Sequence, residues 1–377
     1  MTERFSYQNV VIVWTGGIGT RVAQQISETQ WLSWWHKHPT RLVGLVNSGN
    51  IIVEQNQRTI QRIIDGNMTK EELKNELSQA GKKRTNSWNY DDVISELQNQ
   101  WWNMSDIVII DTTADKSSGM LEFHKSILKE GGKIATANKN PISLFGMDDF
   151  MTLTNERWAY RYSASVMAGA PWINVLQDAF DTRNRVLWIE GCFSGTLGFL
   201  SSGIEKRKLS EVLKEAIDKG YTEPNPWDDL NGLDVARKIL ILARTAGFAL
   251  DMEDITVESF LPKEFEKYPK EEIVWAVREQ LDTEWEERVK KLASEWKTLR
   301  YVAKLEVDTY GKPTIKVGLQ EVEKNSPLGS LSGTKNKITI RTKNSGEQTF
   351  EQAGAGVNVT AQWVINDLRA LLPRTIA

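Results

Sequence analysis

The chain has 377 residues, which is enough for two or three structural units with substantial cores. Its net charge is −3 and charged residues make up 26%, so the composition carries no basic footprint for a nucleic-acid partner. One cysteine, Cys192, excludes an internal disulfide, and because neither a leader peptide nor an apolar run of about 18 residues occurs, we expect a cytoplasmic protein without a membrane partner.

Apolar runs alternate with polar helical segments over the first 150 residues. Residues 9–14, NVVIVW, are followed by the Gly-rich TGGIG and then by a helical pattern. Three further apolar runs predict strands at 41–48, 106–113 and 133–138, and the charged region between them predicts helices at 54–103. Strands that alternate with helices predict an α/β fold with a Rossmann-type, doubly wound parallel sheet. We assign residues 1–150 to a dinucleotide-binding domain.

The pattern changes after residue 150, where several runs alternate with a period of two residues. Four of these runs predict strands of a second sheet, at 158–166, 186–195, 299–307 and 313–322. TYGKP at 309–313 predicts a hairpin turn, and the charged stretch 263–297 predicts helices. We therefore expect an α+β domain with a mixed sheet over residues 151–345. A Gly-rich turn and a helix follow in the C-terminal segment, residues 346–377.

The turn after the first apolar run resembles a dinucleotide fingerprint, G-x-G-x-x-G. Its register places Trp14 on the first glycine, whereas the second and third glycines are present. We predict that the turn binds a cofactor through Thr15, Gly16, Gly17, Ile18 and Gly19. A Gly-rich surface turn is the simpler alternative. The second strand ends in Asn47 instead of the acid that binds an NAD ribose, so NAD and NADP both remain open.

Residues 220–238, GYTEPNPWDDLNGLDVARK, concentrate charge where a loop enters an apolar helix. Asp234 and Lys238 stand four residues apart and share one helical face. Burying such a pair costs several kcal/mol per ion unless the partners compensate each other. The two interpretations are a solvated ion pair on a helix surface and a functional site.

Five motifs in this sequence resemble those of homoserine dehydrogenases. The loop and helix at 221–238 are similar to YTEPDPRDDLxGxDVARK, and the strand ends DTT at 111–113 and TANK at 136–139 are similar to DxTS and TxNK. SGT at 194–196 and GAG at 354–356 also match family motifs. The resemblance implies an NAD(P)-dependent oxidoreductase that reversibly reduces L-aspartate 4-semialdehyde to L-homoserine, in threonine and methionine biosynthesis. It also implies a monofunctional homodimer, and a C-terminal helix that packs back on the nucleotide domain.

The resemblance also implies a role for each matching residue. Lys238 is the expected proton donor, with Lys139 as a cooperating cation and Asp234 as the group that orients Lys238 or the substrate. The implied substrate-binding residues are Glu223, Tyr221, Asp229, Gly195 and Thr196. Besides the Gly-rich turn, the implied cofactor-binding residues are Asn47, Thr113, Lys139 and Gly356. Taken alone, Lys139 could be a solvated strand cap and Glu223 an exposed loop carboxylate.

The family's monovalent-cation site is altered in this sequence. Ser163 stands where relatives carry a carboxylate, which leaves backbone oxygens as candidate ligands for Na⁺ or K⁺. These oxygens belong to Val166, Ala168 and Ala170.

The chain contains 15 tryptophans, and three of them fall on positions where the resembling family has glycine: Trp14, Trp296 and Trp363. We hypothesise that one codon read as glycine in the source organism is represented here by tryptophan. If the substitutions are real, Trp14 obstructs the phosphate turn, and the alternative function is that of a non-catalytic dinucleotide-binding homologue. A third possibility, thioester chemistry at Cys192, lacks a nearby histidine to activate the thiol.

Overall fold

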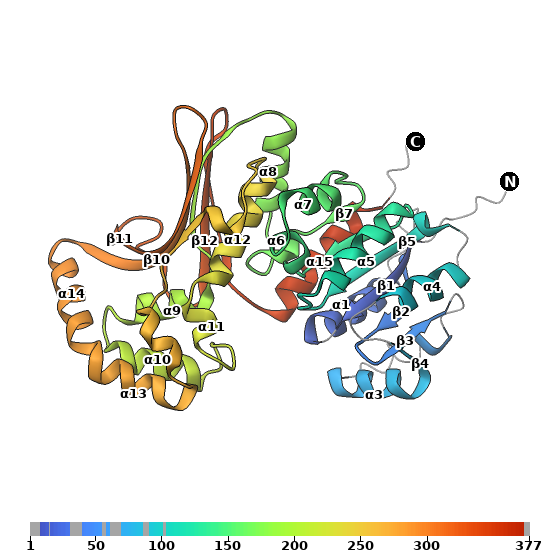
Figure 1. Ribbon diagram of the computed structural model, residues 1–377, viewed down its shortest axis with the longest axis horizontal. Helices are drawn as coiled ribbons and strands as arrows, with labels where there is room; N and C mark the ends of the chain where they lie inside the picture. The colour runs from blue at the N-terminus through green and yellow to red at the C-terminus, as the bar shows by residue number, and fades with distance from the viewer. Residues whose placement is uncertain are drawn as a thin grey trace. The chain divides into compact units, whose positions relative to one another are not determined.

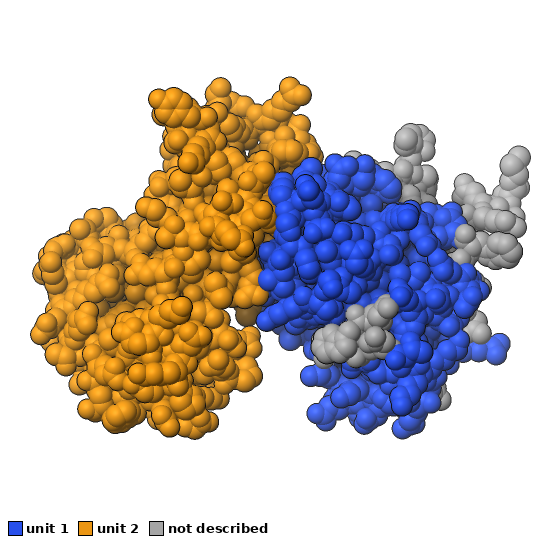
Figure 2. All heavy atoms as spheres, viewed as in Figure 1, with its two compact units in different colours: residues 1–170, 356–377 blue, residues 171–355 orange. Residues whose placement is uncertain are grey.

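The computed structural model describes residues 8–14, 16–30, 40–54, 58–60, 69–85, 90–100 and 103–372. Contacts between Cα atoms divide the chain into two compact units (Figure 2). Unit 1 comprises residues 1–170 and 356–377, and unit 2 comprises residues 171–355. Among the described residues no helix is long and apolar enough to cross a membrane.

Within the described residues of unit 1, sheet A has seven strands in the order β4-β3-β2-β1-β5-β6-β7. The strands are β1 (Gln8–Trp14), β2 (Thr40–Val46), β3 (Asn50–Val53), β4 (Lys82–Lys83), β5 (Ile107–Thr112), β6 (Lys133–Thr136) and β7 (Tyr160–Arg161). The pairs from β2 through β1, β5 and β6 to β7 are parallel, as predicted, whereas β3 and β4 add an antiparallel edge. The central strands are buried, which agrees with their continuous apolar sequences.

The described helices of unit 1 connect the strands of sheet A and pack on its faces. They are α1 (Gly17–Gln30), α3 (Lys70–Ala80), α4 (Asp91–Gln100), α5 (Ser118–Lys129), α6 (Asn140–Ser143), α7 (Met147–Thr154) and α15 (Val357–Ala370), with 3₁₀ turns η2 (Met104–Asp106) and η3 (Ser163–Ser165). The connections β1-α1-β2 and β5-α5-β6 run in opposite directions along the sheet. Because such crossovers are right-handed, α1 and α5 cover opposite faces of the sheet. The order in which the chain adds strands reverses between β1 and β5.

The C-terminal helix α15 packs against α1, although more than 300 residues separate them in sequence (Figure 1). Both helices contribute to one apolar cluster, in which Val22 and Ile26 of α1 join Val364 and Leu368 of α15. The core of unit 1 is therefore built from residues near both ends of the described chain.

Sheet B, in unit 2, has six strands in the order β13-β12-β8-β10-β11-β9. They are β8 (Val186–Cys192), β9 (Ile255–Val257), β10 (Lys297–Val307), β11 (Pro313–Glu323), β12 (Lys335–Thr342) and β13 (Gly346–Ala353). All pairs are antiparallel except β9 with β11. The predicted hairpin joins β10 to β11, with Gly311 at φ +88°. Helices α9 and α12 both contact β10, so they pack on this sheet.

The helices of unit 2 are α8 (Trp172–Asp181), α9 (Gly195–Gly203), α10 (Leu209–Asp218), α11 (Trp227–Leu230), α12 (Leu233–Thr245), α13 (Lys270–Gln280) and α14 (Asp282–Ser294), with 3₁₀ turns η4 (Met252–Asp254) and η5 (Lys263–Lys267). The predicted helical stretch 263–297 corresponds to η5, α13 and α14.

The structure corrects one predicted strand. The run 158–166 was expected in the second sheet, but Tyr160 and Arg161 form β7, which pairs in parallel with β6 of sheet A. The alternating pattern arises because Tyr160 and Tyr162 are buried in unit 1. The contact boundary between the units therefore falls at residue 170, after β7 and η3.

Candidate active site

Lys238 lies on α12 with only 13% of its side chain exposed. Its Nζ is 2.8 Å from Asp234 Oδ2, one turn earlier on the same helix. It also donates a hydrogen bond to the Phe193 carbonyl oxygen at 2.7 Å. Phe193 directly precedes Ser194, the N-cap of α9, so Lys238 ties α12 to the start of α9. These two partners use two of the three ammonium protons and leave one for a reactant.

The start of α12 depends on Gly232, which has φ +76° and occupies the N-cap position. A Cβ atom at this position would lie 1.9 Å from Tyr301 Oη. That hydroxyl donates to the Glu258 carbonyl oxygen at 2.5 Å, so it cannot move away without losing a hydrogen bond. Glycine is therefore required both by the backbone conformation and by the close packing. The apolar face of α12 beyond this point is buried, which fixes the direction in which Lys238 projects.

One hydrogen-bonded group joins three segments: the start of α9, the loop that follows α10, and helix α11. Thr196 Oγ1 is 2.6 Å from the Tyr221 carbonyl oxygen and 3.2 Å from Asp229 Oδ1. The other carboxylate oxygen, Asp229 Oδ2, accepts the backbone N–H of Glu223 at 2.7 Å. Hydrogen bonds thus join four of the five residues predicted to bind substrate, and the fifth, Gly195, directly precedes Thr196.

Burial raises the pKa of Asp229 to about 6, although the hydrogen bonds from Glu223 N–H and Thr196 oppose the shift. Asp229 is therefore an acceptor whose charge changes just below neutral pH. It holds the backbone of the loop that carries Glu223, whose own side chain is exposed.

Tyr221 and Gly195 occupy the edges of the same group. Tyr221 is 40% exposed, and its ring packs edge-on against Phe199 of α9 with the centroids 5.1 Å apart. At Gly195, a Cβ atom would come within 3.2 Å of the Thr334 carbonyl oxygen. The absence of a side chain at 195 lets the start of α9 approach the strand that follows residue 334.

In unit 1, the Gly-rich turn leads directly into α1, which begins at Gly17. The first N–H groups of an α-helix have no acceptor within the helix, so Gly17, Ile18 and Gly19 present donors suited to a pyrophosphate. A Cβ atom at Gly17 would lie 3.5 Å from Val357, the residue after Gly356. The structure therefore places Gly356 next to the turn. Thr15 and the side chain of Trp14 lie outside the described residues.

The ends of β5 and β6 are joined by hydrogen bonds through Thr113 and Asn138. Asn138 Nδ2 donates to Thr113 Oγ1 at 3.1 Å, and the backbone N–H of Asp115 donates to the same oxygen at 3.2 Å. Asn138 Oδ1 accepts the N–H of Asn140 at 3.0 Å. Lys139 lies between these two asparagines and is partly buried at the start of α6. Asn138 was missed in the sequence, although it belongs to the TANK motif.

Asn47 uses its side chain to shape the turn after β2. Its Oδ1 accepts the N–H groups of Gly49 and Asn50, both at 2.8 Å. Its carbonyl oxygen accepts a hydrogen bond from Arg84 Nη1 at 3.1 Å. The Arg84 guanidinium is also 3.2 Å from Asp92, so an arginine does stand beside Asn47. Sequence reasoning missed it because 37 residues separate the two positions.

The predicted cation ligands lie in the turn after η3. Ser163 is fully buried beside Asp367, which interacts with both its side chain and its backbone. Its N–H donates to Asp367 Oδ2 at 2.7 Å, and burial raises the pKa of Asp367 to about 6. Ala168 has φ +61°, so the backbone of this turn is strained.

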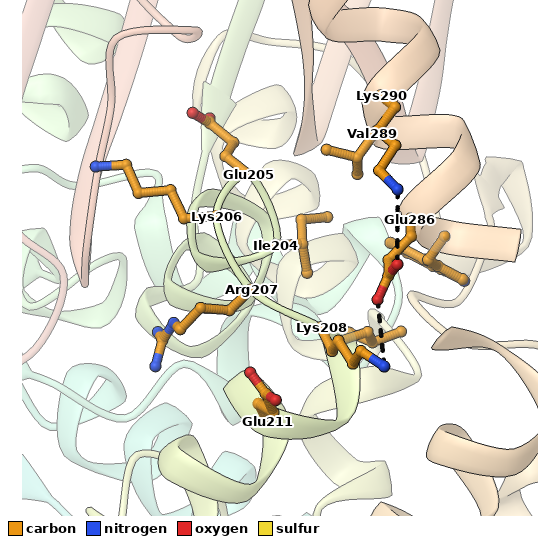
Figure 3. Close-up of a pocket in the computed structure, with 11 residues that line it drawn as sticks. Ile204, Glu205, Lys206, Arg207, Lys208, Glu211, Glu286, Val289 and Lys290 are labelled. Carbon is orange, nitrogen blue, oxygen red and sulfur yellow. Dashed lines mark ion pairs between the residues drawn. The ribbon is translucent and has the colours of Figure 1, made fainter. Parts of the chain in front are cut away.

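A cavity of about 390 Å³ lies elsewhere in unit 2, between the segment 204–211 and α14. Ile204, Trp285 and Val289 line it, and Lys208 and Lys290 point toward Glu286 at 3.6 and 3.9 Å (Figure 3). None of the predicted site residues lines this cavity. It is therefore separate from the group around Thr196 and Lys238.

Comparisons with known proteins give a consistent result. The family model described as homoserine dehydrogenase matches residues 171–368. A homoserine dehydrogenase of Paracoccidioides brasiliensis is 34% identical over 312 residues, which are 79% of this chain and 82% of the relative. A crystal structure of a Candida auris protein of unknown function has a TM-score of 0.81 and 26% identity, covering 97% of this chain and 98% of the other. A hyperthermophilic archaeal homoserine dehydrogenase in complex with NADPH shares the fold, with a TM-score of 0.70, 20% identity and coverage of 96% and 97%.

Proposed function

Because the chain belongs to the homoserine dehydrogenase family, we propose that it catalyses the reversible NAD(P)H-dependent reduction of L-aspartate 4-semialdehyde to L-homoserine. The observation that carries this proposal is the position of Lys238, a largely buried ammonium held by Asp234 and by the backbone at the start of α9. A solvated surface pair would not be so buried or so anchored. The family membership does not favour the alternative of a non-catalytic homologue.

Lys238 is the proposed proton donor. As the aldehyde is reduced, its oxygen gains negative charge, which a nearby ammonium stabilises and then protonates. In the oxidation of homoserine the neutral amine takes the hydroxyl proton back. Asp234 and the Phe193 carbonyl restrict the lysine side chain, so Nζ is oriented before the reactant binds.

The nicotinamide cofactor, when bound, supplies or accepts the hydride. The residues of unit 1 fit such a group: Gly17, Ile18 and Gly19 present helix N-terminal donors, and Thr113 lies at the carboxyl end of β5, next to the point where the sheet reverses direction. Lys139 is the proposed second cation near the reacting oxygen. NADP and NAD are both proposed cofactors. No carboxylate follows β2 to bind the ribose of NAD, and Arg84 beside Asn47 is suited to the 2′-phosphate of NADP.

The substrate's ammonium group requires an acid, and Glu223 is the proposed partner. Its exposed side chain belongs to a loop that Asp229 and Thr196 hold through hydrogen bonds. Tyr221 borders the same loop. Cys192 does not support thioester chemistry, because burial raises the pKa of its thiol to about 12 and keeps it protonated.

A monovalent cation, Na⁺ or K⁺, is a further proposed ligand. The carbonyl oxygens of Val166, Ala168 and Ala170 are hard oxygen donors suited to such an ion, which would stiffen the turn. We also propose a homodimer, on the basis of the family resemblance. The single cysteine, which is buried and free, supports a proposed cytoplasmic location. Light scattering on the purified protein tests the dimer.

Homoserine-dependent reduction of NAD⁺ and NADP⁺ tests the function. We expect the wild type to be active and Lys238→Ala to lose at least about 100-fold in kcat, as is typical when a general acid is removed. Lys214→Ala is the matched control, because Lys214 also pairs with an acid four residues away, Asp218, but on the exposed surface of α10. If Lys238→Ala kept the rate of the control, the assignment of the proton donor would be wrong.

A further inference from the structure

A chain of buried polar groups runs beneath the end of β5, outside the set of predicted site residues. Asp111, His124 and Tyr160 are each 0% exposed. His124 Nε2 lies 3.2 Å from Asp111 Oδ2, and His124 Nδ1 lies 3.1 Å from Tyr160 Oη. The three residues come from β5, α5 and β7, so they link the sheet to one of its covering helices.

This arrangement needs a reason, because a buried carboxylate is costly unless it is paired and hydrogen-bonded. Burial opposes the ionisation of Asp111, but His124 and the N–H of Thr113 outweigh it and hold the pKa of that carboxyl below its usual range. Tyr160 stays a neutral hydroxyl, because burial and the charge of Asp111 raise its pKa. Asp111 is therefore an anion whose partners have fixed positions.

The Asp111 carboxylate also contacts residues at the ends of β5 and β6. Asp111 Oδ1 accepts the backbone N–H of Thr113 at 2.8 Å, and Thr136 Oγ1 lies 3.3 Å from Oδ2. Thr136 Oγ1 in turn accepts the N–H of Asn138 at 2.9 Å. One carboxylate thus sets the backbone at the ends of both β5 and β6.

Thr113 shows what this geometry controls. Its Oγ1 already accepts hydrogen bonds from Asn138 Nδ2 and from Asp115 N–H, so both lone pairs are used. Its own hydroxyl proton is directed at the Asp111 carboxylate, so Asp111 fixes Thr113 through both the backbone N–H and the side chain. Thr113 is the residue at this strand end that the family resemblance assigns to the cofactor.

We propose that His124 is a positioning residue, which acts through Asp111 to orient Thr113 and Asn138 toward the nicotinamide; this inference rests on the proposed function. His124 acts through Asp111: its Nε2 lies 3.2 Å from Asp111 Oδ2, a close polar contact without hydrogen-bond alignment. Tyr160 Oη contacts Nδ1 at 3.1 Å and holds the ring beside the carboxylate. The effect of His124 therefore falls on cofactor binding and on kcat.

The test measures NADPH affinity by fluorescence and turnover by steady-state kinetics. His124→Leu leaves the Asp111 carboxylate buried without its main partner, and we expect the Kd for NADPH to rise at least about tenfold. His124→Gln places an amide N–H at the position of Nε2, so it should restore most of the affinity. Ile127→Ala is the matched control: Ile127 is 1% exposed on the same helix, and its loss should lower stability but leave the Kd unchanged.

A second measurement uses the wild type, so it does not depend on whether His124→Leu folds. The sequence contains three histidines, and His124→Gln identifies the signal of His124 in a ¹⁵N-histidine NMR spectrum. We expect Nε2 to carry a proton beside the Asp111 carboxylate. An unprotonated Nε2, or a His124→Leu variant that binds NADPH as the wild type does and loses only stability, would overturn the proposal. If the wild type binds NADPH but does not oxidise homoserine, the proposed function fails while the Kd comparison still tests His124.

Discussion

Trp296 occupies a backbone conformation that favours glycine. It has φ +58° and follows α14, whose last helical residue is Ser294, so it stands at the position after the C-cap where helices most often place glycine. Its side chain is 76% exposed, which means that the ring adds little packing to offset the strain. We therefore predict that Trp296→Gly stabilises the protein.

The size of the effect follows from two opposing terms. A residue with a Cβ atom costs about 1–2 kcal/mol in the left-handed region. Glycine loses about 0.5–1 kcal/mol more conformational freedom on folding than other residues. Since the exposed ring contributes little, we expect a net gain of about 0.5–1 kcal/mol in the free energy of unfolding.

Trp275→Gly is the matched control. Trp275 is 60% exposed in the interior of α13, where the backbone is helical, so its replacement should cost about 0.5 kcal/mol. The assay is urea unfolding followed by circular dichroism, because the substitutions remove fluorophores. Trp296→Ala, which keeps a Cβ atom, should gain little. Equal losses in Trp296→Gly and Trp275→Gly would refute the reasoning, and mass spectrometry of the protein from its natural source would show whether residue 296 is already glycine.

Two further predictions concern the substrate-binding group. Asp229 is ionised above its pKa of about 6 and protonated below it, so KM for homoserine should rise as the pH falls from 7 to 5. Asp229→Asn should show a higher KM that does not depend on pH in this way. A wild-type KM that stays constant over this range would contradict the role of the carboxylate. Gly232→Ala should lower the free energy of unfolding by about 2–4 kcal/mol and reduce kcat, because the added Cβ displaces Tyr301 and the start of α12. An unchanged midpoint of urea unfolding would show that the added Cβ does not clash with Tyr301.

The fold was predictable where burial leaves a continuous or periodic apolar pattern. The strands β1, β2, β5 and β6 are buried on both faces, so each contains a continuous apolar run. Strands β12 and β13 were both missed. β13, GEQTFEQA, is exposed along most of its length and carries no apolar alternation. β12, KNKITIRT, is mostly buried, but it has only two apolar residues among polar ones. β7 was assigned to the wrong sheet, since a short alternating run does not reveal which sheet it joins.

The candidate site was predictable where its geometry is local in the chain. Lys238 and Asp234 are four residues apart, so helical periodicity alone predicts that they pair. Arg84 beside Asn47 and His124 beside Asp111 depend on how distant segments pack, and a single sequence carries no signal for such contacts. The motifs identify which residues act, whereas the residues that position them emerge only from the fold.

The tryptophans at glycine-like positions differ in what supports the codon hypothesis. At Trp296 the backbone itself favours glycine, independently of any relative. Trp363 lies within α15, where glycine costs about 1 kcal/mol relative to alanine, so a natural glycine there would need another reason. The turn of predicted cation ligands supplies one: a Cβ atom at Gly169 would lie 2.5 Å from the Cβ of Trp363, which means that this turn and α15 approach each other closely. A side chain at 363 restricts residue 169 to glycine, and glycine at 363 would relieve the same crowding from the other side.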